Sequence, residues 1–391
     1  MTLSVNEVVA AHQKRFGVQG RVYVAPGRVN LIGEHTDYTG GFVLPAAIDF
    51  ETLAVVSARE DGKAVFYSAN YCEQTEYELD ELKAATSKTA RCEHWSDYPA
   101  GVAWSVMQEG VALQGFNMTL SGNVPLGAGL SSSASLEVAT AIALLGHAGV
   151  AMVPEKMAVV CRRAENEYVG AKSGIMDQFV VSCGAEGHAL LLDCRSLEYA
   201  LLPIPDDVRI VICNSMVKHA VATGEYGNRR DEVEAGQAAL RACKPCIELL
   251  RDATLADLEA CESAMPREAF LRCRHIITEN GRVQEARAAL EHGDMGRFGE
   301  LMHKAHVSFR DDFASSCEEV DTLVELARRL PGCIGARITG GGFGGCTVNL
   351  VHAAETDAFM KRLVEGYCVA TGIKADVYVC HASAGAHAVV G

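Results

Sequence analysis

The sequence has no apolar run long enough to cross a bilayer, and its first residues contain no apolar segment of the kind found in secretory signals. Positive charge is also scarce, since 35 Lys and Arg stand against 50 Asp and Glu, for a formal net charge of −15. Sequence-independent binding to nucleic acid or to anionic membranes depends on Lys and Arg. We therefore expect a cytoplasmic protein with neither nucleic acid nor a membrane as a partner.

The 15 cysteines do not follow the spacing of a disulfide framework. Cys243-Lys244-Pro245-Cys246 is the one CxxC motif, and neither a second pair nor a histidine at zinc-finger distance accompanies it. His303 and His306 lie three residues apart in an expected helix, a spacing that more often marks a helix surface than a metal site. These patterns favour reduced thiols and no metal site built from protein side chains alone.

The 391-residue chain is longer than one hydrophobic core usually serves, so we expect two domains. Residues 201–205, Leu-Leu-Pro-Ile-Pro, are the best linker candidate and divide the chain into residues 1–200 and 201–391. Alternating apolar residues predict a strand at 21–25, before a polar loop, and two strands at 52–59 and 64–69. The Asp61-Gly62 turn between the latter two predicts a hairpin. Polar and Ala-rich helices are expected across 257–329.

Residues 125–135, Pro-Leu-Gly-Ala-Gly-Leu-Ser-Ser-Ser-Ala-Ser, have the composition of an anion-binding loop. An expected strand at 116–120 precedes them, and 136–145, apolar except for Glu137, predicts a buried helix after them. Gly127 and Gly129 allow close backbone approach, and the serines lie where free N–H groups and the helix dipole favour negative oxygens. An ordinary capped turn uses the same residue types, so the spacing leaves both interpretations open.

Two classes of phosphate-binding protein are excluded by what this loop and the chain lack. No Lys follows the glycines, as the P-loop of NTPases requires, and the sequence has neither the His-Arg-Asp nor the Asp-Phe-Gly motif of protein kinases. The later run Gly340-Gly341-Gly342-Phe343-Gly344-Gly345 formally matches a dinucleotide-binding fingerprint. It lies between two expected strands, at 334–338 and 346–351, rather than between a strand and a helix, so that interpretation fails.

Two polar segments remain without an obvious structural purpose. Residues 26–41 carry Arg, Asn, Glu, His, Asp and Tyr side chains within a short loop, a mixture suited to the hydroxyls of a sugar, although a solvated turn would look similar. Residues 170–178 place Asp177 in an otherwise apolar run, where a carboxylate is costly unless it is paired, used or a helix cap. Glu165, in a helix expected at 154–168, would by default be a surface charge.

These segments carry a resemblance to a known family. Residues 125–135 resemble the central motif of the GHMP small-molecule kinases, which wraps the nucleotide triphosphate, and 340–345 resemble their glycine-rich third motif. Residues 27–38, Gly-Arg-Val-Asn-Leu-Ile-Gly-Glu-His-Thr-Asp-Tyr, are similar residue for residue to the galactokinase signature. The resemblance spans nearly the whole chain and implies an α+β, two-domain GHMP kinase fold. Each domain would be a mixed or antiparallel sheet packed with helices, with the active site in the cleft between them.

The resemblance also implies a reaction, the ATP-dependent phosphorylation of α-D-galactose at its C1 hydroxyl with Mg²⁺ as cofactor. Residues 173–178 resemble the segment that bears the catalytic aspartate. Asp177 would thus act on the hydroxyl, and Arg28 would keep that carboxylate ionised and offset phosphoryl charge. The implied sugar contacts are Glu34, His35, Asp37, Gly174 and Tyr226. The implied phosphate cradle is Gly127, Ala128, Gly129, Leu130, Ser131, Ser132 and Ser133, with Ser132 and Glu165 near the Mg²⁺. A monomer or weak homo-oligomer is expected.

Two rival functions share these motifs. One is an N-acetylgalactosamine kinase, because the sequence does not determine tolerance at the sugar C2 position. The other is a non-catalytic galactose-sensing regulator of transcription. Such sensors lack the Ser-Ala pair in the phosphate loop, so Ser133-Ala134 favours an enzyme.

Overall fold

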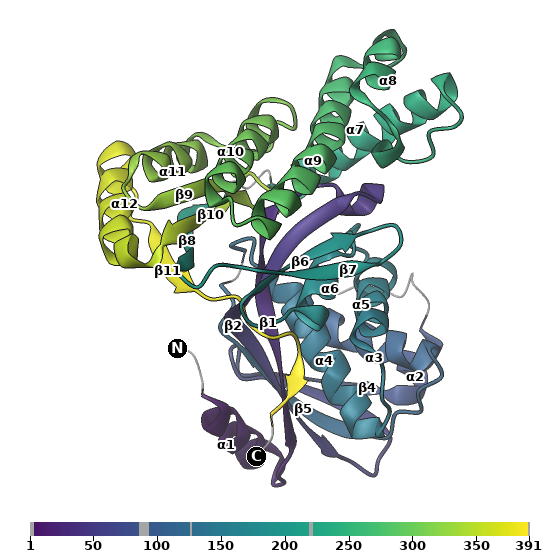
Figure 1. The fold of residues 1–391 in the computed structure, drawn as a ribbon. Coiled ribbons are helices and arrows are strands. Elements are labelled where there is room, and N and C mark those ends of the chain that lie inside the picture. Colours follow the sequence, from purple (N-terminus) through teal and green to yellow (C-terminus); the bar gives the residue numbers. More distant parts are fainter. Residues whose placement is uncertain (1–3, 86–93, 126, 219–221, 390–391) are drawn as a thin grey trace.

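The computed structural model describes residues 4–85, 94–125, 127–218 and 222–389, which form two sheets with helices packed on them (Figure 1). The larger sheet is mixed, with strand order β12-β1-β2-β5-β3-β4, and β6 and β7 extend it from β2. Its strands are β1 (Arg21–Ile32), β2 (Phe42–Ala58), β3 (Lys63–Ser68), β4 (Glu73–Glu78), β5 (Phe116–Gly122), β6 (His188–Asp193), β7 (Tyr199–Pro203) and β12 (His387–Ala388). The last strand thus returns to the first sheet, beside β1.

Helices cover both faces of this larger sheet. The long strands β1, β2 and β5 are buried along most of their length. One set of their side chains packs with α3 (Asp97–Gln108), α4 (Ser132–Ala148), α5 (Pro154–Arg163) and α6 (Met176–Cys183). The amphipathic helix α1 (Val5–Phe16) packs against the opposite face through Val8. A short helix, α2 (Leu79–Ala84), follows β4.

The second sheet is antiparallel, in the order β11-β8-β10-β9. It consists of β8 (Val208–Lys218), β9 (Cys333–Thr339), β10 (Gly344–His352) and β11 (Asp376–Cys380), and packs with α10 (Met295–Asp311), α11 (Glu318–Arg329) and α12 (Thr356–Thr371). The helices α7 (Ala222–Cys243), α8 (Leu255–Ala260) and α9 (Arg267–Glu291) extend away from it (Figure 1). At its other end α9 packs against β1, β2 and β7 of the first sheet, so it joins the two bodies.

The two-sheet α+β architecture expected from the motifs is confirmed, and the glycine run 340–345 does join two antiparallel strands. The polar loop expected from residue 26 is wrong in part. The strand β1 continues to Ile32, with register shifts at Pro26/Gly27 and Asn30/Ile32. Proline and glycine here produce irregularities in a strand rather than its end. The Leu130 carbonyl accepts from Arg28 N, and the Thr339 and Arg337 side chains bond to the backbone of Asn30.

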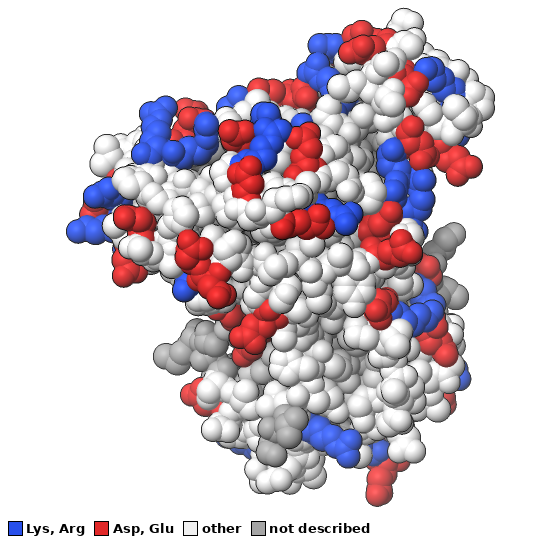
Figure 2. All heavy atoms as spheres, in the orientation of Figure 1, with Lys and Arg blue, Asp and Glu red and all other residues white. Residues whose placement is uncertain are grey.

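Two other local predictions are also corrected. The strands on either side of Asp61-Gly62 exist, but β5 lies between them and pairs antiparallel with β2 and parallel with β3, so they do not form a hairpin. The expected linker at 201–205 is in part β7, which pairs with β6. In the described part of the chain, no helix has the length and apolarity to span a membrane. On the face shown in Figure 2, acidic and basic side chains are interspersed among the described residues.

Candidate active site

Arg28 and Asp177, 149 residues apart in sequence, meet in a bidentate ion pair. Arg28 lies in β1 and Asp177 in the first turn of α6, and the Arg28 Nε and Nη2 groups donate to Oδ1 and Oδ2 at 2.8 and 2.7 Å. The Arg28 side chain is 6% exposed and that of Asp177 29%. Burial opposes the charge of Arg28, but the acidic neighbours Asp177, Glu34 and Asp37 together outweigh it and raise the pKa of the guanidinium. The pair therefore presents a fixed carboxylate to solvent with its counter-charge behind it.

Residues 127–133, the expected phosphate cradle and here called the phosphate loop, lie directly beside this pair. Arg28 Nη1 donates to the Gly129 carbonyl at 2.5 Å, and the Ser131 hydroxyl donates to Asp177 Oδ2. Ser131 is the N-cap of α4 in a left-handed conformation (φ 58°), but its side chain makes no capping bond. The Ser131 side chain thus does not occupy the first N–H groups of α4, and an anion-binding helix start requires these groups to be available. The described residues of the expected cradle are Gly127, Ala128, Gly129, Leu130, Ser131, Ser132 and Ser133.

The glycine-rich run of the second domain packs on this loop, backbone against backbone. A Cβ added to Gly340 would lie 2.9 Å from Gly129 Cα, and one added to Gly129 would lie 3.0 Å from the Thr339 carbonyl oxygen. Both glycines have positive φ, of 87° and 76°. Side chains at these two positions would push the domains apart, so the glycines set how closely the second domain approaches the phosphate loop.

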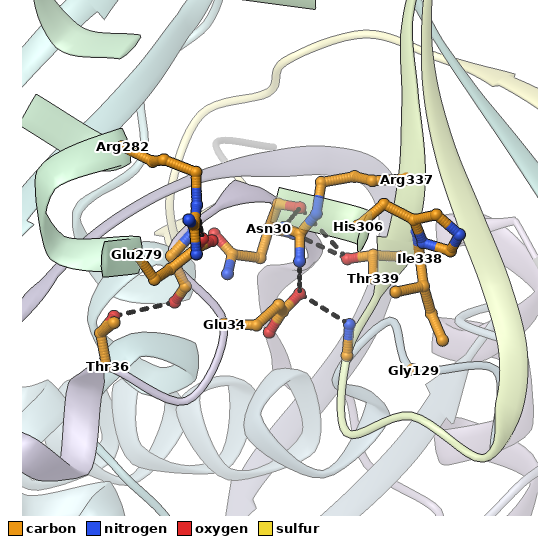
Figure 3. Close-up of polar contacts among 12 residues, drawn as sticks. Asn30, Glu34, Thr36, Gly129, Glu279, Arg282, His306, Arg337, Ile338 and Thr339 are labelled. Carbon is orange, nitrogen blue, oxygen red and sulfur yellow. Dashed lines mark hydrogen bonds and ion pairs between the residues drawn. The ribbon is translucent and has the colours of Figure 1, made fainter. Parts of the chain in front are cut away.

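Glu34 follows the end of β1 and turns toward the second domain (Figure 3). Its Oε1 accepts from the Gly340 N–H at 3.0 Å and lies 3.4 Å from Arg337 Nη2. Burial raises the pKa of Glu34, while the positive charges of Arg337 and Arg28 act in the opposite direction. Glu34 therefore joins the signature segment, residues 27–38, to the glycine-rich run, residues 340–345, and lies within electrostatic range of Arg28.

Asp37 and Gly174 lie against each other. A Cβ on Gly174 would be 1.6 Å from Asp37 Oδ2, so only glycine leaves room for this carboxylate. Burial raises the pKa of Asp37, and the nearby charge of Asp177 raises it further. Two of the expected sugar-binding residues are thus brought together, within electrostatic range of the expected catalytic aspartate.

His35 is held in an aromatic cluster. Its ring stacks on Phe313 at 4.2 Å between centroids, and its Nδ1 lies 3.0 Å from the Tyr38 hydroxyl. Burial lowers the pKa of His35 well below its ordinary value, so the ring is neutral at pH 7. A neutral imidazole can both donate and accept hydrogen bonds, as contact with sugar hydroxyls requires.

Tyr226 lies in α7, but its side chain is outside the described residues. Arg230, one turn later on the same helix, stacks over the Tyr38 ring at 4.8 Å and donates to the Lys172 carbonyl. Arg230 therefore directs its face of α7 at Tyr38 and at residues 170–178.

Glu165 belongs to a π-helical segment, Ala164–Val169, that continues α5. Its Oε2 accepts from Ser173 Oγ at 2.5 Å and from Gln178 Nε2 at 2.9 Å. The same Gln178 nitrogen donates to Glu137 Oε2 at 2.8 Å. Burial raises the pKa of Glu165 and raises that of the fully buried Glu137 well above its ordinary value. Glu165 is therefore a positioned buried carboxylate, not the surface charge that its sequence context suggests.

A cavity of about 800 Å³ opens beside the start of α4. Ser132 and Ser133 line one part of it, and Tyr71, Trp95 and Tyr98 line another. Its size and aromatic lining suit a flat heterocycle, and its position adjoins the phosphate loop. Sequence reasoning did not identify this cavity, because its aromatic residues come from separate segments of the first domain.

Sequence reasoning also missed a row of buried polar side chains on α9 that hold the sugar signature. The Glu279 Oε1 accepts from Gly33 N at 2.9 Å, and the His275 Nε2 lies 3.2 Å from the Glu34 carbonyl oxygen. Asn280 Oδ1 accepts from Phe42 N at 2.9 Å. Burial opposes ionisation of Glu279, but Arg282 and other neighbouring positive charges prevail and lower its pKa to about 2. Glu279 and Asn280 thus accept hydrogen bonds from the backbone N–H groups of Gly33 and Phe42, at the two ends of the segment that joins β1 to β2.

Comparison with known proteins places these features in a family context. The family model of the galactokinase galactose-binding signature matches residues 10–58, and those of the GHMP kinase N-terminal and C-terminal domains match residues 97–185 and 286–365. A galactokinase of Chloroflexus aggregans is 41% identical over 97% of both chains, and one of Actinobacillus succinogenes 43% identical over 93% of both.

Solved structures agree with the sequence matches. The Lactococcus lactis galactokinase complexed with galactose superimposes with a TM-score of 0.93 at 32% identity, over 98% of this chain and 100% of the other. The mevalonate kinase of Methanococcus jannaschii has a TM-score of 0.66 at 17% identity, over 93% and 98% of the two chains. The latter likeness concerns the fold alone.

Proposed function

Because this chain belongs to the galactokinase family of the GHMP kinases, we propose that it transfers the γ-phosphoryl group of ATP to the C1 hydroxyl of α-D-galactose at Asp177 and Arg28. The products are α-D-galactose 1-phosphate and ADP. The observation that carries the proposal is the bidentate Arg28–Asp177 pair beside the phosphate loop. It joins a sugar-facing carboxylate, a buried cation and a helix start suited to phosphate at one point.

Asp177 accepts the proton of the C1 hydroxyl as the hydroxyl oxygen attacks the γ-phosphorus and the bond to the β,γ-bridging oxygen breaks. Arg28 fixes the orientation of the carboxylate and places positive charge near the transferred group. Phosphoryl transfer has a loose transition state, so positioning and charge neutralisation supply most of the catalysis. Ser131 supports this arrangement, because its hydroxyl donates to the same carboxylate.

Galactose contacts Glu34, His35, Asp37, Gly174 and Tyr226. Asp37 and Tyr226 bond the axial C4 hydroxyl, so an equatorial hydroxyl, as in glucose, would leave buried polar groups unpaired. Sites built on hydroxyl contacts discriminate by about 10⁴-fold or more. The space that Gly174 leaves for the Asp37 carboxylate supports this assignment.

ATP binds with its phosphates over residues 127–133 and its base in the 800 Å³ cavity lined by Trp95 and Tyr98. A Mg²⁺ ion fits the donor set of Ser132 and Glu165, since both offer oxygen ligands and magnesium is usually held by one or two protein oxygens plus substrate phosphates. Within the described residues, no group of three or more His, Cys, Asp or Glu side chains could hold a metal. Bound Mg²⁺ would neutralise phosphate charge, and Ser173 and Gln178 orient the Glu165 carboxylate toward that task.

We also propose a domain division, a cellular location and an oligomeric state. The domain division at residues 1–200 and 201–391 falls within β7 (Tyr199–Pro203), and β12 returns to the first sheet. The protein is a cytoplasmic monomer or weak homo-oligomer.

A coupled assay of ADP release across galactose, N-acetylgalactosamine, glucose and mevalonate tests the proposed function. Turnover on galactose alone, or far above the others, is the expected result. Turnover on N-acetylgalactosamine above galactose would replace it with the corresponding amino-sugar kinase. Galactose binding without ADP release would indicate a sensor.

A further inference from the structure

Arg337, in the middle of β9, is the largest fully buried side chain among the residues that the structure describes, with 0% exposure. Its Nη1 donates to the Asn30 carbonyl at 3.4 Å, and its Nη2 lies 3.4 Å from Glu34 Oε1. Among the described residues, neither its Nε nor its Nη2 has a hydrogen-bond partner of good geometry. Burying a guanidinium with so few bonds is costly, so its presence requires an explanation beyond packing.

Glu34 supplies that explanation. Its carboxyl group is nearly as buried, at 3% exposure for the residue, and the Gly340 N–H and Arg337 both approach the same oxygen, Oε1. Glu34 and Arg337 face each other across the domain boundary in Figure 3, one from the sugar signature and the other from the second sheet. The orientation leaves Oε2 as the oxygen that can accept from a sugar hydroxyl.

We propose that Arg337 is a positioning residue for galactose, which holds Glu34 as a carboxylate with Oε1 toward the second domain and Oε2 toward the sugar. This inference rests on the proposed function, because it takes Glu34 as a galactose contact. It also connects two substrate sites. Arg337 lies three residues before Gly340, and Gly340 packs on Gly129, so the same strand end that contacts Glu34 also packs on the phosphate loop.

The charges around Glu34 determine how the loss of Arg337 would appear. Arg337 faces it from β9 and Arg28 from β1, with Asp37 and Asp177 behind Arg28. His275 of α9 lies against the Glu34 carbonyl oxygen, and burial lowers its pKa to about 4, so it carries no charge from pH 6 to 9. Burial favours the neutral carboxyl, and the two arginines oppose that effect. Without Arg337, burial prevails more strongly, and Glu34 takes up a proton at higher pH. A protonated Glu34 donates rather than accepts, so galactose binding should weaken on acidification in that variant.

The test is calorimetry of galactose binding without nucleotide, from about pH 6 to 9, on Arg337→Met. We expect affinity at neutral pH to fall by ~10- to 100-fold, the usual loss for one bond to a charged group, and to recover partly as the pH rises. The KM for ATP should change far less. Arg272→Met is the matched control. Arg272 is 5% exposed and pairs with Glu232 and the Asp312 carbonyl, so its loss removes a buried guanidinium that does not contact Glu34.

A double-mutant cycle separates this inference from the proposed function. If Glu34→Gln binds galactose normally, the assignment of Glu34 to the sugar is wrong, and the proposed contacts fail with it. If Glu34→Gln is impaired, Arg337→Met in that background should add little and should show no pH dependence. Additive losses, or equal losses for galactose and ATP, would mean that Arg337 is merely structural and would overturn the inference.

Arg337→Lys guards against misfolding of the Met variant, because it keeps the charge with a single ammonium group. Its galactose affinity should be intermediate and its pH profile nearly flat. Wild-type affinity in Arg337→Met, or in Arg337→Lys where the Met variant does not fold, would overturn the inference.

Discussion

Asp177→Asn is the most direct perturbation of the proposed chemistry, because it keeps the shape of the side chain and removes its charge. The asparagine oxygen can keep one of the two bonds to Arg28, at Nε or Nη2, and loses the other. It also loses the ability to take the hydroxyl proton. General base catalysis is typically worth ~10² to 10⁴-fold, so we expect turnover to fall by that factor. Galactose affinity should be largely retained.

The same substitution has a cost in stability that can be derived from burial. Breaking a buried ion pair by removing one partner costs about 3–5 kcal/mol, since the other charge is left uncompensated. Asp177 is 29% exposed and the asparagine keeps one bond, so we expect the low end of that range or less, about 2–3 kcal/mol. Chemical denaturation of the ligand-free protein measures this loss.

Arg28 and Asp177 should behave as a unit in kinetics. Arg28→Met alone should also reduce turnover steeply, because it frees the carboxylate and removes a positive charge near the phosphoryl group. The double variant should be much less impaired than the product of the two single losses. ADP release measures turnover, and calorimetry of galactose binding is the control. Multiplicative losses, or normal turnover in Asp177→Asn, would refute the assignment of chemistry to this pair.

Three further predictions follow from other contacts. Gly174→Ala should raise the galactose KM by ~10-fold or more with little change for ATP, since its Cβ would displace the Asp37 carboxylate, whereas Gly281→Ala, whose Cβ meets nothing within 4 Å, should behave as wild type. Calorimetry should detect little Mg²⁺ binding without nucleotide, because magnesium is usually held by substrate phosphates plus one or two protein oxygens. Tight Mg²⁺ binding to the nucleotide-free protein would contradict this expectation. Glu165→Gln should lower turnover more than it lowers galactose affinity. Burial lowers the pKa of His12 to about 4, so the folded state resists its protonation and the free energy of unfolding should fall as the pH drops from ~6.5 toward 4; an unchanged slope in His12→Gln would argue against it.

The sequence predicted the sugar signature correctly as a functional segment and incorrectly as a loop. Arg28 and Asn30 are polar, and Pro26-Gly27 precedes them, so local rules end the strand at residue 25. In the structure, β1 continues because Arg28 pairs with α6 and the Asn30 backbone bonds to Thr339 of β9. Those partners lie far along the chain, and no pattern within a short window can reveal them.

The hairpin predicted from the Asp61-Gly62 turn was wrong for a related reason. The turn residues determine the local reversal of the chain, but not which strand lies alongside. In the structure β5, about 50 residues later, takes the place between β2 and β3. The hairpin rule concerns two strands alone, so the insertion of a third is outside what it can predict.

The proposed catalytic pair, Arg28 and Asp177, and the phosphate loop at residues 127–133 could be proposed from sequence, because each lies within a motif, whereas the buried residues that contact the signature segment could not. Glu279 contacts Gly33, 246 residues away in sequence, and Arg337 contacts Asn30, 307 residues away.

A single charged residue on a helix or strand is a surface residue by default, and the sequence around Glu279 contains no sign to the contrary. Arg337 did give one, since it is the only charged residue in the strand 333–339, just as Glu137 is in the apolar helix 136–145. A lone charge in an apolar element must find a partner or remain costly. Both residues proved to be fully buried beside a carboxylate of the proposed site, Glu34 for one and Glu165 for the other. An isolated charge within an apolar run is therefore a sequence signal for the support of an active site, even where no motif contains it.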